Sequence, residues 1–302
     1  MAVMTRLHHP KQLQDGLNAV FGMEYSRQPN RWEKMFSVYT SNKAYEEDVL
    51  NFGFGGAAIK PEGGAVTYDQ GGESWTARYL MVTIALAFAL TEEMVEDGLY
   101  ASYGERYSSA LARSMKYTEE VRAHSILNNG FDSNFAGGDG KELFATDHPL
   151  SGGGTFANEL STPADLSEDA IEDACIAIRK FVDDRGLPVM TRPQCLFVPV
   201  DSEFIAKRVL QTPNAPGTAN NDINAVKGVF PQGYGISEYL SDTNAWFIKT
   251  DTPHGLKKFN RRKLKKGMEG DFETGNLRYK ATQRYAFGWT DPRGAFASAG
   301  AT

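Results

Sequence analysis

Hydrophobic and polar residues alternate with a period of two between Leu80 and Leu90. The even-numbered positions are large and apolar and the odd-numbered ones are mostly alanine, a pattern typical of a half-buried strand, with a helix as the alternative. Thr91 then has the place of an N-cap with two glutamates in the first turn, and apolar residues recur every three or four positions. The pattern predicts a strand that runs directly into one unusually long amphipathic helix, residues 91–127.

Residues 36–80 have the pattern of a long hairpin. Aromatic and β-branched residues lie on both sides of a glycine-rich centre at residues 53–64, which predicts two extended limbs around a tight tip. Limbs of about 15 residues would reach roughly 50 Å at about 3.3 Å per residue. Because a two-stranded ribbon is marginal by itself in water, something outside it must cover its aromatic side chains, namely Tyr45, Phe52, Phe54, Tyr68 and Trp75.

The remaining segments predict an arm, a compact α/β unit and a return to strands. Residues 1–35 are polar and mixed, so we expect an arm outside the core, with a short helix near residues 12–20. Ser167 has the place of an N-cap at the start of a helix with one apolar stripe. A buried strand at residues 194–198 follows, and then a second helix that ends near Leu210. Two more strands complete this unit, and the pattern from Gly255 to Trp289 is again typical of strands. The fold class is therefore α+β.

Charge is unevenly distributed along the 302 residues. The chain carries −6 overall, which argues against a globally cationic nucleic-acid binder, whereas residues 251–284 hold ten Lys and Arg against four Asp and Glu. We expect this basic segment to contact acidic surfaces of neighbouring copies; a solvated strand edge and a nucleic-acid contact are the alternatives. The residues concerned are Lys257, Lys258, Arg261, Arg262 and Lys263.

No residue pattern indicates catalysis, a cofactor or a metal site. Ser151 follows His148 closely but lacks the Gly-x-Ser-x-Gly context of a nucleophile elbow. The five histidines and two cysteines show no ligand spacing, and both Cys175 and Cys195 lie on apolar stretches, as core residues do. We expect a protein that is not an enzyme. A soluble hydrolase that uses His148 or Cys195 is the alternative from another class.

The N-terminus has no apolar segment typical of a signal peptide, and the longest apolar run is shorter than the roughly 20 residues of a membrane span. Two cysteines do not form a disulfide framework. These features predict a soluble protein that is made in the cytoplasm and has no membrane partner.

The order of these elements resembles the major capsid proteins of tailed phages, and more closely the Mu-like major head subunit branch of the Hong Kong 97-type fold. The resemblance is carried by residues 80–97 (LMVTIALAFALTEEMVED), 145–150 (ATDHPL) and 276–294 (NLRYKATQRYAFGWTDPRG).

That resemblance implies the parts of a capsid subunit. Residues 1–35 would be the N-terminal arm and residues 36–80 the extended loop. The peripheral domain would comprise residues 81–160, with a spine helix at about 91–127, and the return strands of residues 250–302. The axial domain would be residues 161–249.

The resemblance also implies hexamers and pentamers that close an icosahedral phage shell around double-stranded DNA, without sequence-specific contact. Each extended loop, with Lys60 at its tip, would lie over a neighbour. We expect a separate scaffold protein, a portal, an optional decoration protein, and assembly of the virion capsid in the host cytoplasm. A nanocompartment that encloses protein cargo is the alternative within the same fold.

Overall fold

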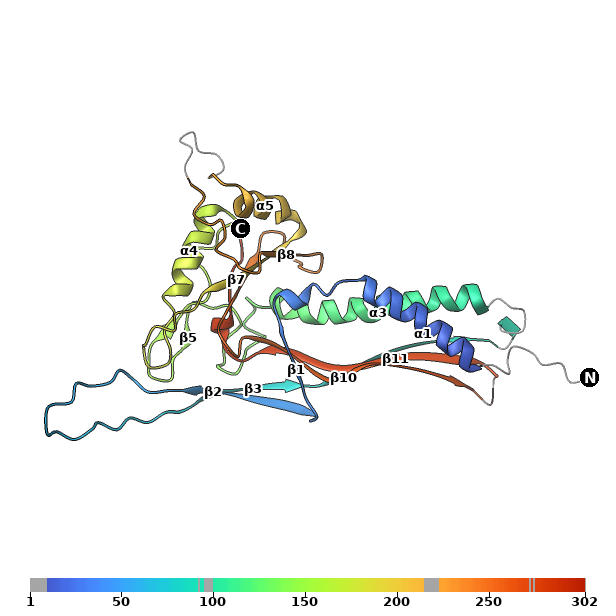
Figure 1. Cartoon of the computed structure of the whole chain (residues 1–302), viewed down its shortest axis with the longest axis horizontal. Helices are drawn as coiled ribbons and strands as arrows, with labels where there is room; N and C mark the ends of the chain where they lie inside the picture. Colours follow the sequence, from blue (N-terminus) through green and yellow to red (C-terminus); the bar gives the residue numbers. More distant parts are fainter. Residues whose placement is uncertain are drawn as a thin grey trace, which may run out of the picture.

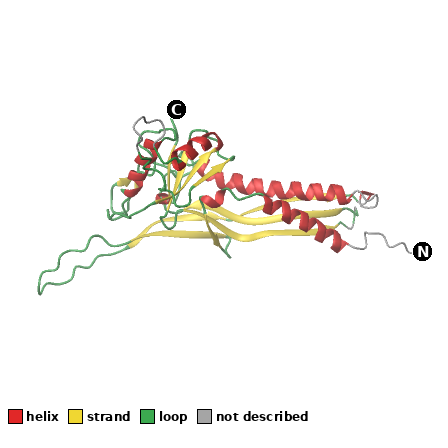
Figure 2. Cartoon of the chain, turned by 45° about the horizontal axis from the view of Figure 1, so that its top comes forward, coloured by secondary structure: helices red, strands yellow, loops and turns green. Residues whose placement is uncertain are grey.

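The computed structural model describes residues 10–91, 93–94, 100–214, 223–271, 273 and 275–301. The molecule has a long part, in which two helices cover a sheet, and a compact α/β unit that stands at one end of it (Figure 1). A two-stranded hairpin extends from this end, and its loop projects beyond the rest of the chain (Figure 2).

The long part is a four-stranded sheet of order β1-β10-β11-β4, in which β1 runs parallel to β10 and the other neighbours are antiparallel. Two long helices and a short 3-10 helix pack on one face of this sheet. The elements are α1 (Pro10–Arg27), η2 (Trp32–Lys34), β1 (Ser37–Thr40), β4 (Val82–Leu90), α3 (Tyr100–Asn128), β10 (Leu256–Gly270) and β11 (Leu277–Trp289).

The predicted strand and long helix are both present. Strand β4 keeps the alternation in part: Val82, Ile84 and Phe88 are half-buried and the alanines are exposed. Three positions depart from the prediction, because Leu80 and Leu86 are 67% and 47% exposed and Met81, expected on the other face, is buried. The Thr91 hydroxyl accepts a hydrogen bond from the Met94 N–H at 3.3 Å, as an N-cap does. Helix α3 ends at Asn128, one residue from the predicted end, whereas residues 92 and 95–99 of the predicted helix lie outside the described residues.

The segment before residue 36 is not an arm outside the core. Helix α1 extends to Arg27, and its Leu17 and Phe21, one turn apart, are buried against α3 and β11. Trp32 and Met35 are also buried, in a second cluster beside the C-terminal half of α3. The short helical pattern seen in the sequence underestimated α1 because only one narrow stripe of this helix is apolar.

The hairpin is shorter than predicted. Its strands β2 (Tyr45–Phe52) and β3 (Gly72–Leu80) pair antiparallel from Tyr45 opposite Leu80 to Phe52 opposite Gly72, and residues 53–71 form no strand. Residues 37–40 belong to β1 of the large sheet instead. The paired limbs therefore have eight and nine residues rather than about fifteen.

The α/β unit is a sheet of order β12-β9-β7-β8 with two helices on one face. Ser167 caps the first helix, since its hydroxyl accepts from the Ala170 N–H at 3.1 Å. The elements of this unit are α4 (Glu168–Arg179), β7 (Pro193–Pro199), η3 (Val200–Ser202), α5 (Glu203–Gln211), β8 (Tyr234–Ser237), β9 (Trp246–Thr250), η4 (Pro292–Gly294) and β12 (Ala295–Ser298), with the small bridge β5 (His148–Pro149) and β6 (Thr155–Phe156) beside it.

Strand β12 corrects the predicted division of the chain. The segment 250–302 was expected to contribute only return strands to the long part, but residues 295–298 pair with β9 in the sheet of the α/β unit. The last segment therefore crosses from one part to the other. At the crossing, a Cβ atom on Gly294 would lie 2.2 Å from the Gly255 Cα atom, so neither position has room for a side chain.

Candidate assembly interface

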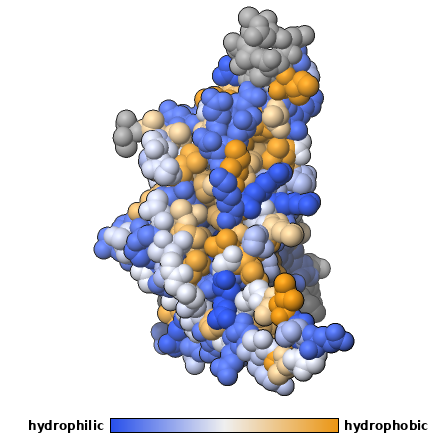
Figure 3. All heavy atoms as spheres, turned by 90° about the vertical axis from the view of Figure 1, so that its left-hand side faces the viewer, coloured by the Kyte–Doolittle hydropathy of each residue, from blue (hydrophilic) through white to orange (hydrophobic). Residues whose placement is uncertain are grey.

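The loop at the end of the hairpin, residues 53–71, exposes large apolar side chains. Phe54 and Val66 are each 64% exposed, Tyr68 is 94% exposed and Ile59 is 97% exposed. This loop projects away from the body of the chain (Figures 1 and 2). Exposed apolar groups that gather on one segment mark an interaction surface, and the space-filling view of this end shows hydrophobic patches set among hydrophilic side chains (Figure 3).

Two polar contacts attach the base of this loop to the rest of the chain. The Asp69 carboxylate accepts from the Gly55 N–H at 2.8 Å and forms an ion pair with the Arg185 guanidinium at 2.7 Å. The pKa of Asp69 is lowered by the hydrogen bonds from the backbone N–H groups of Gly55 and Gln70 and by the charge of Arg185. The hydroxyls of Ser74 and Ser151 lie 2.5 Å apart. The contacts hold the loop base against the α/β unit.

The aromatic residues predicted to need cover divide into two groups. Phe54 and Tyr68 are exposed, and Tyr45 is 40% exposed with the Arg78 guanidinium over its ring. Trp75, in contrast, is half-buried, and its Nε1–H donates to the Thr290 carbonyl at 2.9 Å. Phe52 is also half-buried. The chain itself covers Trp75, because the base of the hairpin packs on β11.

Lys257 and Lys258 do not belong to an exposed interface. Both are buried, at 3% and 4% exposure; Lys257 pairs with Asp48 of the hairpin and Lys258 with Glu119 of α3. Burial lowers the pKa of Lys258. Their carboxylate partners lie more than a hundred positions away in the sequence, so the basic run gave no sign of them.

The rest of the basic run remains on the surface. Arg262 and Lys263 are exposed, Arg261 is half-buried, and Lys60 is exposed near the loop tip. The contact of these residues with a neighbouring copy stays a prediction.

A buried acidic pair on α3 holds the N-terminal segment in place. Glu119 accepts from the Tyr25 hydroxyl at 2.8 Å and pairs with Lys258, and Glu120 accepts from the backbone N–H of Arg31 at 2.8 Å. Burial raises the pKa of Glu120 to about 7. Sequence reasoning missed this pair, although Glu119 falls on the apolar stripe of Met115, Ala123 and Leu127, where a charge is a warning of a buried partner.

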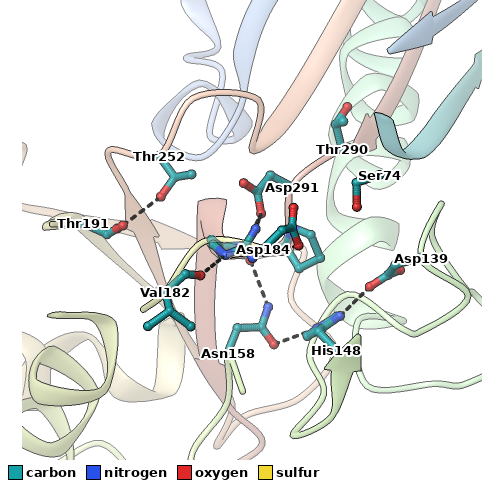
Figure 4. Close-up of polar contacts among 12 residues, drawn as sticks. Ser74, Asp139, His148, Asn158, Val182, Asp184, Thr191, Thr252, Thr290 and Asp291 are labelled. Carbon is teal, nitrogen blue, oxygen red and sulfur yellow. Dashed lines mark hydrogen bonds and ion pairs between the residues drawn. The ribbon is translucent and has the colours of Figure 1, made fainter. Parts of the chain in front are cut away.

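His148 belongs to a buried polar cluster between the two parts of the molecule (Figure 4). Its Nδ1 lies 2.6 Å from Asp139 Oδ2 and its Nε2 lies 3.1 Å from Asn158 Oδ1. The Asn158 amide nitrogen donates to the carbonyls of Leu143 and Pro292, at 2.7 and 3.0 Å. His148 is fully buried and both of its ring nitrogens are engaged, so the geometry favours a structural role for it.

Arg293 occupies the other side of this cluster. It is 3% exposed, its Nε–H donates to the Val182 carbonyl at 2.9 Å, and its guanidinium lies beside Asp184 and Asp291. Burial raises the pKa of Asp291. These contacts connect η4 to the segment after α4.

The remaining candidates for a chemical role are Cys195 and a metal site. Cys195 is fully buried and burial raises the pKa of its thiol, which disfavours a nucleophilic thiolate. The described ranges hold no group of three or more potential metal ligands. Within the same ranges, no helix is both long and apolar enough to cross a bilayer.

The arrangement of long helix-covered sheet, α/β unit and projecting hairpin defines the class: this is a Hong Kong 97-type capsid fold. It is similar to the capsid of a native GTA particle (TM-score 0.57, 11% identity, 89% of this chain and 90% of that chain). It is also similar to a virus-like particle from Pyrococcus furiosus (TM-score 0.55, 9% identity, 94% of this chain and 98% of that chain). A third similar structure is the procapsid of bacteriophage JBD30 (TM-score 0.53, 14% identity, 98% of this chain and 76% of that chain).

The sequence also identifies the family to which the chain belongs. A family described as "Phage capsid protein" matches residues 76–298, which is most of the chain. The protein belongs to this phage capsid protein family. A search of curated proteins found no match.

Proposed function

We propose that this protein is the major capsid protein of a tailed phage of the Mu-like branch, and that it assembles into the hexamers and pentamers of an icosahedral shell around double-stranded DNA. The observation that carries the proposal is the loop of residues 53–71. This loop projects away from the body of the chain (Figure 1) and exposes Phe54, Ile59 and Tyr68, so their cover must come from another molecule.

The parts of the chain then take the roles of a capsid subunit. The hairpin with its loop, within residues 36–80, is the extended loop that lies over a neighbour, and α3 is the spine helix. The sheet around β10 and β11 belongs to the peripheral domain, and residues 161–249 with β12 form the axial domain. The segment before residue 36 is part of the subunit body, because its helix α1 packs on α3 of its own chain.

The protein acts without catalysis or a cofactor. Its partners are further copies of itself, a separate scaffold protein, a portal and an optional decoration protein, and it meets packaged DNA without reading its sequence. Assembly takes place in the host cytoplasm. The net charge of −6 supports a lining that does not adhere to DNA during packaging and ejection.

Electron microscopy of the expressed protein, alone and together with the neighbouring scaffold gene, tests the proposal. We expect closed particles with five-fold and six-fold capsomers. A compact monomer under every condition, with residues 53–71 protected from protease, would contradict it. Particles that contain protein cargo and no nucleic acid in infected cells would favour the nanocompartment, which the similarity to the Pyrococcus furiosus particle keeps as the second candidate.

A further inference from the structure

The two helices of the α/β unit have outer faces of complementary character. On α4, Glu172 and Asp173 are exposed one turn before Ile176, an apolar side chain that is 51% exposed. On α5, Phe204 is 70% exposed one turn before the exposed Lys207 and Arg208. The acids and bases of these two faces form no ion pair with another described residue.

These faces match residue by residue when the helices run antiparallel. If Ile176 lies against Phe204, then Glu172 comes opposite Arg208 and Asp173 opposite Lys207. One turn further along, the exposed Arg179 comes opposite the exposed Asp201 of η3. The same alignment therefore pairs an apolar centre with opposite charges on both sides of it. Such complementarity fixes the register and orientation of two surfaces and disfavours the parallel alignment.

The two helices cannot make this contact within one chain. Helix α4 packs on β12 at one edge of the sheet, whereas α5 packs on β7, next to the strand at the opposite edge. Figure 1 shows α4 and α5 on the two sides of β7, and both bury their inner faces in the same core. Complementary patches on opposite flanks of one unit make a head-to-tail contact between copies, which generates a closed ring where the rotation allows it.

We propose that α4 of one copy docks antiparallel on α5 of the next copy, and that this contact joins the α/β units around each capsomer. The inference rests on the proposed shell function and names the surface through which neighbouring subunits recognise each other. Six copies, or five, then repeat one heterologous contact that combines the Ile176–Phe204 pair with three ion pairs.

Charge reversal tests this contact in the full chain, under the conditions in which the wild type assembles. E172K/D173K places basic residues opposite Lys207 and Arg208, and K207E/R208E places acidic residues opposite Glu172 and Asp173. Two of the three ion pairs in every contact then become pairs of like charge, so we expect each variant alone to lose assembly roughly tenfold or more. The chain that carries all four substitutions restores opposite charges and should assemble as the wild type does. The matched control D15K/E105K makes the same change in net charge on exposed acids of α1 and α3, and should also assemble.

A mixture of the two reversed variants gives a sharper result. Alternating copies restore attraction at every contact of a six-membered ring, but a five-membered ring cannot alternate. An equimolar mixture should therefore form hexamers and open sheets or tubes, seen by negative-stain microscopy, and few closed shells.

The outcomes separate this inference from the function it rests on. Assembly of either reversed variant by itself, or no rescue in both the four-fold variant and the mixture, would overturn the helix contact. Sensitivity to E172K/D173K alone would point to a two-fold contact between α4 helices and would equally overturn it. Absence of particles from the wild type would instead contradict the proposed shell function.

Discussion

At the scale of single residues, the molecule is held by a few buried charges whose partners come from distant elements. Lys258 joins β10 to α3, and Glu120 fixes the backbone of the segment that leads from α1 into η2. A buried ion pair is weak evidence for stability, but the loss of one partner leaves an uncompensated charge in the interior. We therefore expect these residues to be sensitive to substitution.

Lys258→Met should destabilise the folded chain strongly. Methionine fills the space of the lysine stem but leaves Glu119 buried without its cation, which costs about 3–5 kcal/mol in comparable pairs. Urea unfolding of the unassembled chain measures the change. Lys263→Met, on an exposed side chain of the same strand, should stay within about 0.5 kcal/mol of the wild type. Equal effects of the two substitutions would contradict the buried-pair interpretation.

The raised pKa of Glu120 gives a pH dependence with a definite sign. Its folded value of about 7 lies above the ordinary value of 4.5, so the folded chain binds this proton more tightly than the unfolded chain. The contribution of the protonated carboxyl to stability is complete below about pH 4.5 and is lost as the pH rises to about 7. Glu120→Gln keeps an acceptor for the Arg31 N–H and does not titrate. Unfolding curves between pH 5 and 8 should show wild type losing stability relative to this variant, and parallel pH profiles would contradict the assignment.

At the scale of elements, the hairpin combines a rigid base with a loop that has little contact with its own chain. Ala77, Tyr79 and Met81 bury the base against β11, whereas residues 53–71 leave their large apolar groups exposed. The ion pair between Asp69 and Arg185 connects the base of this loop to the segment after α4. We therefore expect folding to depend on the base of the hairpin and assembly to depend on its loop.

Deletion of residues 53–64 should separate these two roles. The deleted segment contributes no residue to the buried clusters of the described chain, so circular dichroism and the thermal unfolding midpoint should change little. Closed shells should disappear, because the missing cover is intermolecular. Intact shells from the shortened chain, seen by negative-stain microscopy, would refute the interlocking role of the loop.

Arg185→Ala should loosen the loop without unfolding the chain. The ion pair with Asp69 is partly exposed, and such pairs contribute about 0–1 kcal/mol to global stability. Amide hydrogen exchange at Gly55 and Gln70 should nevertheless become faster, because both N–H groups donate to the Asp69 carboxylate that Arg185 holds. Arg262→Ala is the matched control on an exposed arginine of β10. Unchanged exchange in the loop would show that the Ser74–Ser151 contact suffices.

At the scale of the whole molecule, two parts with separate sheets are joined where the backbone crosses at Gly255 and Gly294. Beside it, the His148 Nε2 lies 3.1 Å from Asn158 Oδ1 (Figure 4), and the Arg293 Nε–H donates to the Val182 carbonyl. In the proposed shell, contacts with neighbouring copies would act on both parts, and this junction would fix the angle between them.

Gly294→Ala tests the junction. The added Cβ atom would lie 2.2 Å from the Gly255 Cα atom, which is backbone and cannot rotate away, so we expect a loss of about 2–3 kcal/mol, the upper range for overpacking. Gly56→Ala, where nothing lies within 4 Å of the added atom, should be close to neutral. Denaturant unfolding of both variants compares them, and a neutral Gly294→Ala would show that the two backbone segments separate easily.

The sequence by itself determined the strand that leads into α3, the α/β unit with its Ser167 cap, the projecting glycine-rich loop and the order of these elements. Each of these features is local, because periodicity and capping record which face of one segment is apolar. Only the tertiary structure decided that α1 joins the core, that β12 changes sheets, and that Lys257 and Lys258 are buried beside carboxylates. These outcomes depend on which distant elements meet. The sequence pattern around a charged residue does not show whether that charge is solvated, pairs with another copy or pairs within its own chain.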